Sequence, residues 1–127
     1  NRLLVEALKS GAMTIILTAL WLYEQDSAVQ WQTESVVHQG SLTTDIDIAA
    51  QLGNEVWLIE CKDNFKTTDK ALSELITQLQ IGHQIAQDIG ATRYLFSTLY
   101  AKPLPDTLVA FLQDHQIDIL TRSDLLR

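Results

Sequence analysis

The stretch TDIDIAAQLGNEVWLIECK, residues 44–62, decides the fold of this chain. Two runs of strand-forming residues flank Gly53-Asn54, a pair that favours the tight turn of a two-residue hairpin. Pairing about this turn places Asp47 opposite Glu60 and Asp45 opposite Lys62. A loop of odd length or a bulge in either strand would change this register.

Side chains alternate between the two faces of a strand, so these four charged residues share one face of the hairpin. The other face is apolar and brings together Ile46, Ile48, Ala50, Leu52, Trp57, Ile59 and Cys61. Directly opposed Cβ atoms lie about 4.5–5.5 Å apart, and two carboxylates at that spacing repel unless a cation lies between them. A divalent metal ion is one solution. The alternative is an Asp45–Lys62 ion pair at a solvated sheet end, with Glu60 as an edge charge.

The composition is that of an ordinary globular protein, with 127 residues, 46% hydrophobic and 20% charged. The length predicts one domain, and the start at Asn1 is compatible with a domain excised from a longer protein. We find no membrane span, signal peptide or internal repeat. Cys61 is the single cysteine, which favours a reducing, cytoplasmic location and a thiol that packs in the core.

The net charge of −7 argues against non-specific binding to nucleic acid, because phosphate-binding proteins usually carry a basic surface. Lys62, Lys66 and Lys70, however, cluster directly after the acidic pair. Such a run is more often a solvated loop than a track for phosphate groups, and its position beside the predicted site adds weight to the second interpretation.

The remaining sequence predicts an α/β fold with the element order α-β-β-β-α-β-α-β. We expect helices over Arg2–Gln25 (one kinked or two short), from an N-cap at Thr68 or Asp69 to a stop at Gly90, and from Pro105 at the first helical position. We expect strands over Ala28–Val37, Thr44–Leu52, Glu55–Lys62, Arg93–Thr98 and Ile117–Leu120, and a terminal turn over Ser123–Arg127.

A strand–helix–strand crossover makes the strand Arg93–Thr98 parallel to the strand that ends at Lys62. Ser97, Thr98 and Tyr100 should therefore approach the same sheet edge, where α/β folds often bind ligands. The apolar character of both faces of Val56–Ile59 predicts that helices cover the sheet on both sides.

Asp47 followed by Glu60-x-Lys62 on a hairpin resembles the PD-(D/E)xK, or restriction-endonuclease-like, nuclease superfamily. Asp45-Ile46-Asp47 with Ile59-Glu60-Cys61-Lys62 is most similar to Mrr-like nucleases, Holliday-junction resolvases and CRISPR-associated nuclease domains. The motif is short, and its weight comes from the apolar run before Glu60 and the strand–helix context. The resemblance implies a three-layer α/β/α fold with a mixed central sheet over most of the chain, as one nuclease-like domain.

The resemblance also implies roles for individual residues. Asp47, Glu60 and the backbone carbonyl of Cys61 would bind Mg²⁺ or Mn²⁺, and Lys62 would orient the attacking water or stabilise charge on the phosphate. Asp45 would then hold the lysine or support the ligands.

Three further features of the family are incomplete or open in this chain. An acid from the first helix often completes such sites, and Glu6 and Glu24 are the candidates. Ile46 stands where the namesake proline would be. The Gln-x-x-x-Tyr element is broken because Gln78 is followed at that spacing by Gly82, so Gln78 is either a supporting residue of the site or an ordinary polar helix position.

The resulting hypothesis is a Mg²⁺- or Mn²⁺-dependent nuclease, an endonuclease that hydrolyses phosphodiesters of DNA or RNA. The alternatives are an inactive nuclease-fold domain that binds nucleic acid or protein, and a structural accessory domain. A zinc site is not expected, because His38, His83 and His115 are far apart in sequence, and His83 fits a core position. Exposed apolar surface on the first helix, with Trp21, Trp31 and Trp57, makes a homodimer plausible.

Overall fold

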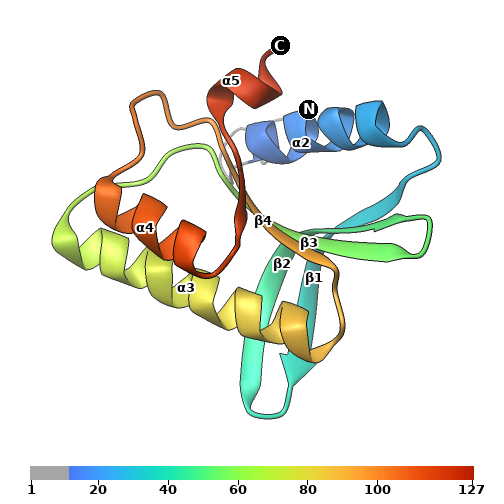
Figure 1. Cartoon of the computed structure of the whole chain (residues 1–127), viewed down its shortest axis with the longest axis horizontal. Helices are drawn as coiled ribbons and strands as arrows, with labels where there is room; N and C mark the ends of the chain where they lie inside the picture. Colours follow the sequence, from blue (N-terminus) through green and yellow to red (C-terminus); the bar gives the residue numbers. More distant parts are fainter. Residues whose placement is uncertain (1–11) are drawn as a thin grey trace, which may run out of the picture.

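The computed structural model describes residues 12–127, apart from the side chains of Glu34, Ser35, Val37, Gln39, Leu42 and Thr43. In this part the chain forms a five-stranded sheet and four helices (Figure 1). The elements are α2 (Ala12–Gln25), β1 (Gln30–Gln39), β2 (Leu42–Leu52), β3 (Glu55–Lys62), α3 (Asp69–Asp88), β4 (Arg93–Thr98), α4 (Asp106–Asp114), β5 (Asp118–Leu120) and α5 (Arg122–Leu125).

The sheet is mixed and follows the order of the sequence, β1-β2-β3-β4-β5. β1, β2 and β3 are antiparallel neighbours, whereas β4 runs parallel to both β3 and β5. The predicted hairpin register is confirmed from Leu52↔Glu55 to Ile48↔Ile59, and Gly53 adopts the positive φ of 61° that its turn requires.

Most predicted boundaries are confirmed to within a few residues. Thr68 caps α3 by accepting the backbone N–H of Ala71, and Gly90 follows the helix with a φ of 80°. Pro105 is the N-cap of α4 rather than its first helical residue. The expected terminal turn is the short helix α5. The predicted helical segment Arg2–Gly11 lies outside the described residues.

Helices cover both faces of the sheet, as the apolar character of β3 predicted. α2 and α5 lie on one side and α3 and α4 on the other (Figure 1). On the α2 side, Leu22 and Leu125 pack with Ile48 and Ile59. The core on the α3 side contains Leu58, Leu75, Leu79, Phe96, Leu108 and Leu112. The burial of these two cores sets the position of β3 and β4 between the helical layers.

Ile46 corrects one prediction. We expected it beside Ile48, but it packs in the core on the α3 side, whereas Ile48 packs on the α2 side. Asp47 lies between them, at the point where the pairing of β2 with β3 has ended and the pairing with β1 continues. Two-stranded ribbons twist more strongly than wide sheets. Here the twist rotates β2 about its own axis, so that Ile46 and Ile48 face opposite helical layers.

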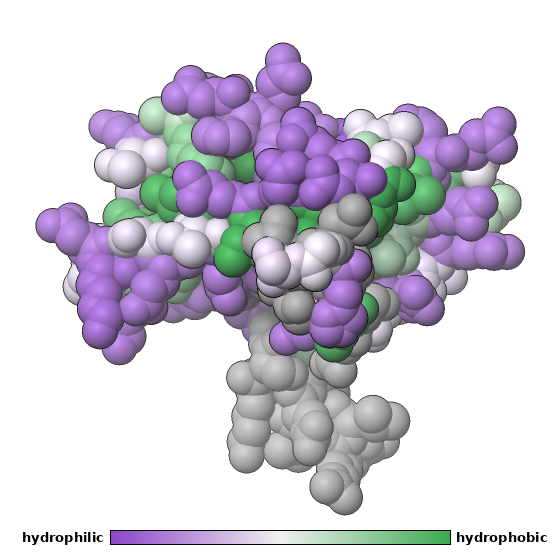
Figure 2. All heavy atoms as spheres, turned by 90° about the horizontal axis from the view of Figure 1, so that it is seen from below, coloured by the Kyte–Doolittle hydropathy of each residue, from purple (hydrophilic) through white to green (hydrophobic). Residues whose placement is uncertain are grey.

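The face seen from below shows a band of hydrophobic residues between hydrophilic margins (Figure 2). No helix in the described part of the chain is long and apolar enough to cross a membrane.

Gly82 on α3 gives the first testable prediction. A Cβ at this position would lie 2.1 Å from Oη of Tyr94, which is buried on β4 beneath the helix. We expect Gly82→Ala to destabilise the fold by about 1–3 kcal/mol despite the better helix propensity of alanine. Tyr94→Phe should restore part of the loss, because it removes the closest atom. Denaturant unfolding of both single variants and the double variant measures this coupling, and strictly additive effects would contradict it.

Candidate functional site

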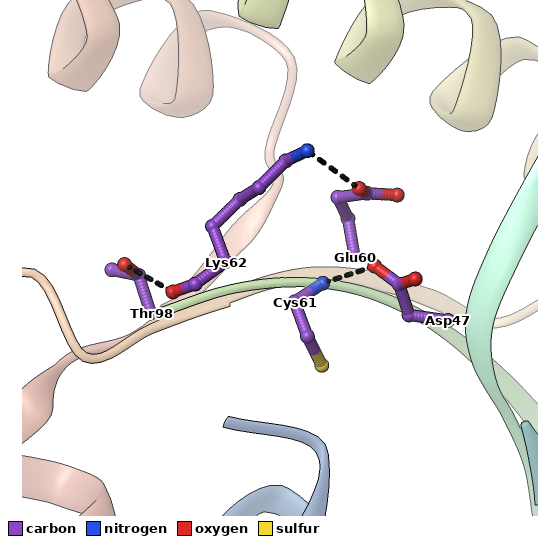
Figure 3. Close-up of polar contacts among 5 residues, drawn as sticks. All are labelled: Asp47, Glu60, Cys61, Lys62 and Thr98. Carbon is purple, nitrogen blue, oxygen red and sulfur yellow. Dashed lines mark hydrogen bonds and ion pairs between the residues drawn. The ribbon is translucent and has the colours of Figure 1, made fainter. Parts of the chain in front are cut away.

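Five of the predicted site residues line one hollow of about 380 Å³ between the sheet and α3. The walls come from β2, β3 and α3, and consist of Thr44, Asp45, Asp47, Glu60, Lys62, Gln78 and Ile81. The charged residues of the hairpin therefore converge, and Gln78 joins them from the helix. Figure 3 shows Glu60 and Lys62 on one side of β3 and the thiol of Cys61 on the other.

The carboxylate of Asp47 takes the place that a backbone carbonyl of β2 would have as the acceptor for a backbone N–H of β3. Its Oδ2 accepts the backbone N–H of Cys61 at 2.7 Å, just beyond the last paired residues of the two strands (Figure 3). A strand residue directs its N–H and C=O toward the same neighbouring strand. The carbonyl of Cys61 therefore lies on the Asp47 side, the position that a backbone metal ligand would need.

Glu60 carries the strongest electrostatic perturbation of the hollow. Burial first, and then the adjacent charge of Asp47, raise its pKa to about 8, against the opposing effect of Lys62. Lys62 Nζ lies 3.8 Å from Oε1 of Glu60. The lysine therefore pairs with Glu60 on its own strand. The expected cross-strand ion pair with Asp45 is not formed. Both residues line the hollow, but β2 no longer pairs with β3 at this point, and Asp45 is exposed opposite Val36 of β1.

Lys62 is held in place through its backbone. Its carbonyl accepts the hydroxyl of Thr98 at 2.8 Å and the N–H of Leu99 at 3.2 Å. Thr98 also accepts the N–H of Tyr100 at 3.1 Å. The predicted approach of the end of β4 to Lys62 is thus confirmed, and it fixes the strand end from which the lysine projects.

A buried polar network behind the site was not predicted. Thr18 Oγ1 lies 2.7 Å from Oγ of Ser97 and also contacts the Cys61 thiol, whose pKa is raised by burial. Asp63, directly after Lys62, accepts the N–H of Thr14 at 2.8 Å and its hydroxyl at 2.5 Å. Thr14 and Thr18 are four residues apart on an apolar helix, so they lie on the same helix face. This spacing is the feature of the sequence that could have indicated a polar contact there. The network ties α2 to the ends of β3 and β4.

The hollow fits a hard divalent cation. Asp47 and Glu60 offer carboxylate oxygens, and the raised pKa of Glu60 indicates that its ionised form lacks the compensating charge that a cation would supply. Within the described residues, no three Asp, Glu, His or Cys side chains form a group that could hold a metal ion. A cation here would therefore need oxygens beyond these carboxylates, from the Cys61 carbonyl, water or a bound phosphate.

Several predicted residues lie elsewhere. Glu6 lies outside the described residues, and Glu24 lines a different hollow between α2 and α5. Lys66 and Lys70 are exposed and do not line the acidic hollow. His83 is only partly buried, with its ring 5.6 Å from that of His115, so it is a residue of the α3–α4 contact rather than a core histidine.

No protein-family model and no curated protein matches the chain. Three solved structures share its fold. The protein of unknown function AF1548 aligns over 84% of this chain and 55% of its own, with a TM-score of 0.62 and 18% identity. VC1899 from Vibrio cholerae aligns over 94% and 32%, with a TM-score of 0.61 and 15% identity. Can2 from Sulfobacillus thermosulfidooxidans, solved in complex with cyclic tetra-adenylate, aligns over 91% and 35%, with a TM-score of 0.67 and 18% identity.

The chain thus spans between 32% and 55% of the length of these proteins. At identities of 15% to 18%, these alignments show that the chains share a fold.

The raised pKa of Glu60 predicts a pH-dependent stability. Below its ordinary pKa of 4.5 Glu60 is protonated in both states, and between 4.5 and about 8 the unfolded chain ionises while the folded chain retains the proton. Without divalent cations, the free energy of unfolding should therefore fall as pH rises through this range. Glu60→Gln should abolish this contribution and exceed the parent in stability at pH 8 by more than about 1.4 kcal/mol. Denaturant unfolding in EDTA measures it, with Glu55→Gln as the control on the same strand.

The hydrogen bond of Asp47 gives a second prediction. Asp47→Asn keeps an oxygen acceptor for the Cys61 N–H, whereas Asp47→Ala removes it. Both changes remove the charge beside Glu60, so their difference isolates the hydrogen bond. We expect the alanine variant to be less stable by about 1–3 kcal/mol. Equal unfolding midpoints for the two variants would refute the role of this contact.

Proposed function

We propose that the chain is a nuclease domain of the PD-(D/E)xK type that hydrolyses phosphodiester bonds of DNA or RNA with Mg²⁺ or Mn²⁺. The observation that carries the proposal is the convergence of Asp47, Glu60 and Lys62 in one hollow, with Gln78 opposite them. The mixed sheet with helices on both faces is compatible with the restriction-endonuclease-like fold.

The chemistry needs a water molecule that attacks phosphorus, one P–O ester bond that breaks, and stabilisation of the charge that develops on the phosphate. Asp47, Glu60 and the Cys61 carbonyl would hold the metal ion, which would supply a Lewis acid and a water of lowered pKa. Lys62 adds a positive charge beside the phosphate and orients the water. Gln78 can donate a hydrogen bond to a phosphate oxygen from the opposite wall.

A nuclease-fold domain that binds nucleic acid without cutting it is the second candidate. It is favoured by the absence of a third ligating side chain near Asp47 and Glu60 among the described residues. Titration with Mn²⁺ separates the two candidates, because a hydrolytic site should bind the ion and lose that binding in Glu60→Gln.

The main prediction concerns cleavage of single- and double-stranded DNA and RNA with Mn²⁺ at neutral pH. Asp47→Asn, Glu60→Gln and Lys62→Gln should each lower the rate at least about 100-fold, because each removes a group that acts on the reacting phosphate. Glu55→Gln and Arg127→Gln match the charge changes at positions outside the hollow and should retain the parental rate. Cleavage that survives all three changes within the site would refute the assignment.

A further inference from the structure

A second hollow of about 340 Å³ opens at the carboxyl ends of β4 and β5. Its polar lining comes from Thr98, Tyr100, Lys102, Thr121, Arg122 and Ser123. None of the described residues that line it is acidic, although the chain carries a net charge of −7. The hydroxyls of Thr98 and Thr121 are donated within the protein, to the Lys62 carbonyl and to Asp124. The two cations, together with the hydroxyls of Tyr100 and Ser123, still form a composition that suits a phosphate.

This hollow adjoins the acidic site. Thr98 lines it and also donates its hydroxyl to the carbonyl of Lys62. Tyr100, in its wall, stacks on Phe65 with ring centroids 4.4 Å apart and an interplanar angle of 20°. This stack joins the loop after β4 to the loop after β3, which carries Lys66 next to Phe65.

Lys66, Lys102 and Arg122 follow the carboxyl ends of three neighbouring parallel strands and form what we call the cationic rim. Nearby carboxylates are already engaged. Asp124 accepts the N–H of Thr121 at 2.8 Å and its hydroxyl at 3.0 Å, which completes the capping box of α5. Arg122 donates from Nη1 to the carbonyl of Leu99 at 3.2 Å, a neutral acceptor, and among the described residues no ion pair involves a cation of the rim. The positive charge of the rim therefore remains available to a ligand.

We propose that the cationic rim binds the backbone of a single-stranded nucleic acid, with a phosphate between Lys102 and Arg122 and a base against Tyr100. The strand continues from the phosphodiester held at Asp47, Glu60 and Lys62, so the inference rests on the proposed function. A partly exposed aromatic ring beside a phosphate site is the pattern of proteins that bind unpaired bases. A row of cations along one edge explains how an acidic chain can bind a polyanion.

The test is fluorescence anisotropy with labelled single-stranded DNA and RNA in EDTA, over a series of salt concentrations. Lys102→Gln and Arg122→Gln should each weaken binding and lower the magnitude of the slope of log affinity against log salt by about 0.7, the value for one phosphate contact on a single strand. Arg127→Gln is the control, since Arg127 lines the hollow between α2 and α5. It should keep the parental slope.

Two outcomes would overturn the proposal: rim variants that bind like Arg127→Gln, or a duplex that binds more tightly than a single strand of equal length. Cleavage by the parent with Mn²⁺ is measured in parallel. Rim variants without effect, together with parental cleavage, refute the rim alone. Reduced salt slopes without parental cleavage refute the hydrolytic function and leave the rim as a binding surface. A parent that neither binds nor cuts refutes both.

Discussion

The hydrogen bond from Cys61 N–H to Asp47 is the contact on which the site depends. It lies where β2 stops pairing with β3, so one carboxylate both closes the end of the hairpin and enters the acidic hollow. A backbone partner at this point would have kept β2 flat against β3 and directed the acid away. The fold therefore uses a side chain in place of a ladder bond, and the break in pairing makes room for the hollow beside Glu60.

Much of the scaffold could be predicted because local signals agreed with one another. Gly53-Asn54 specified the turn, Thr68 and Gly90 bounded α3, and the crossover rule made β4 parallel to β3. These signals depend on near neighbours in sequence or on general topology. They were sufficient to predict that Asp47, Glu60 and Lys62 lie in one place.

The errors arose where long-range geometry overrides strand alternation. Ile46 and Ile48 should share a face in a regular strand, but the twist at Asp47 sends them to opposite cores. The same twist separates Asp45 from Lys62, which then pairs with Glu60. The Thr14–Thr18 network depends on contacts with residues far along the chain, so the sequence offered only a spacing and no partner.

Net charge is a poor guide to local electrostatics because it averages over surfaces with different environments. Buried acids such as Glu60 count toward the total, yet burial raises the pKa of Glu60 to about 8, so it is largely protonated at neutral pH when no cation is present. Lys62, Lys66, Lys102 and Arg122 lie at or after the carboxyl ends of β3, β4 and β5, where parallel strands present their following loops on one edge. Binding by an acidic protein then requires only that the local field at this edge be positive, and screening limits the repulsion from acids more than a Debye length of about 8 Å away.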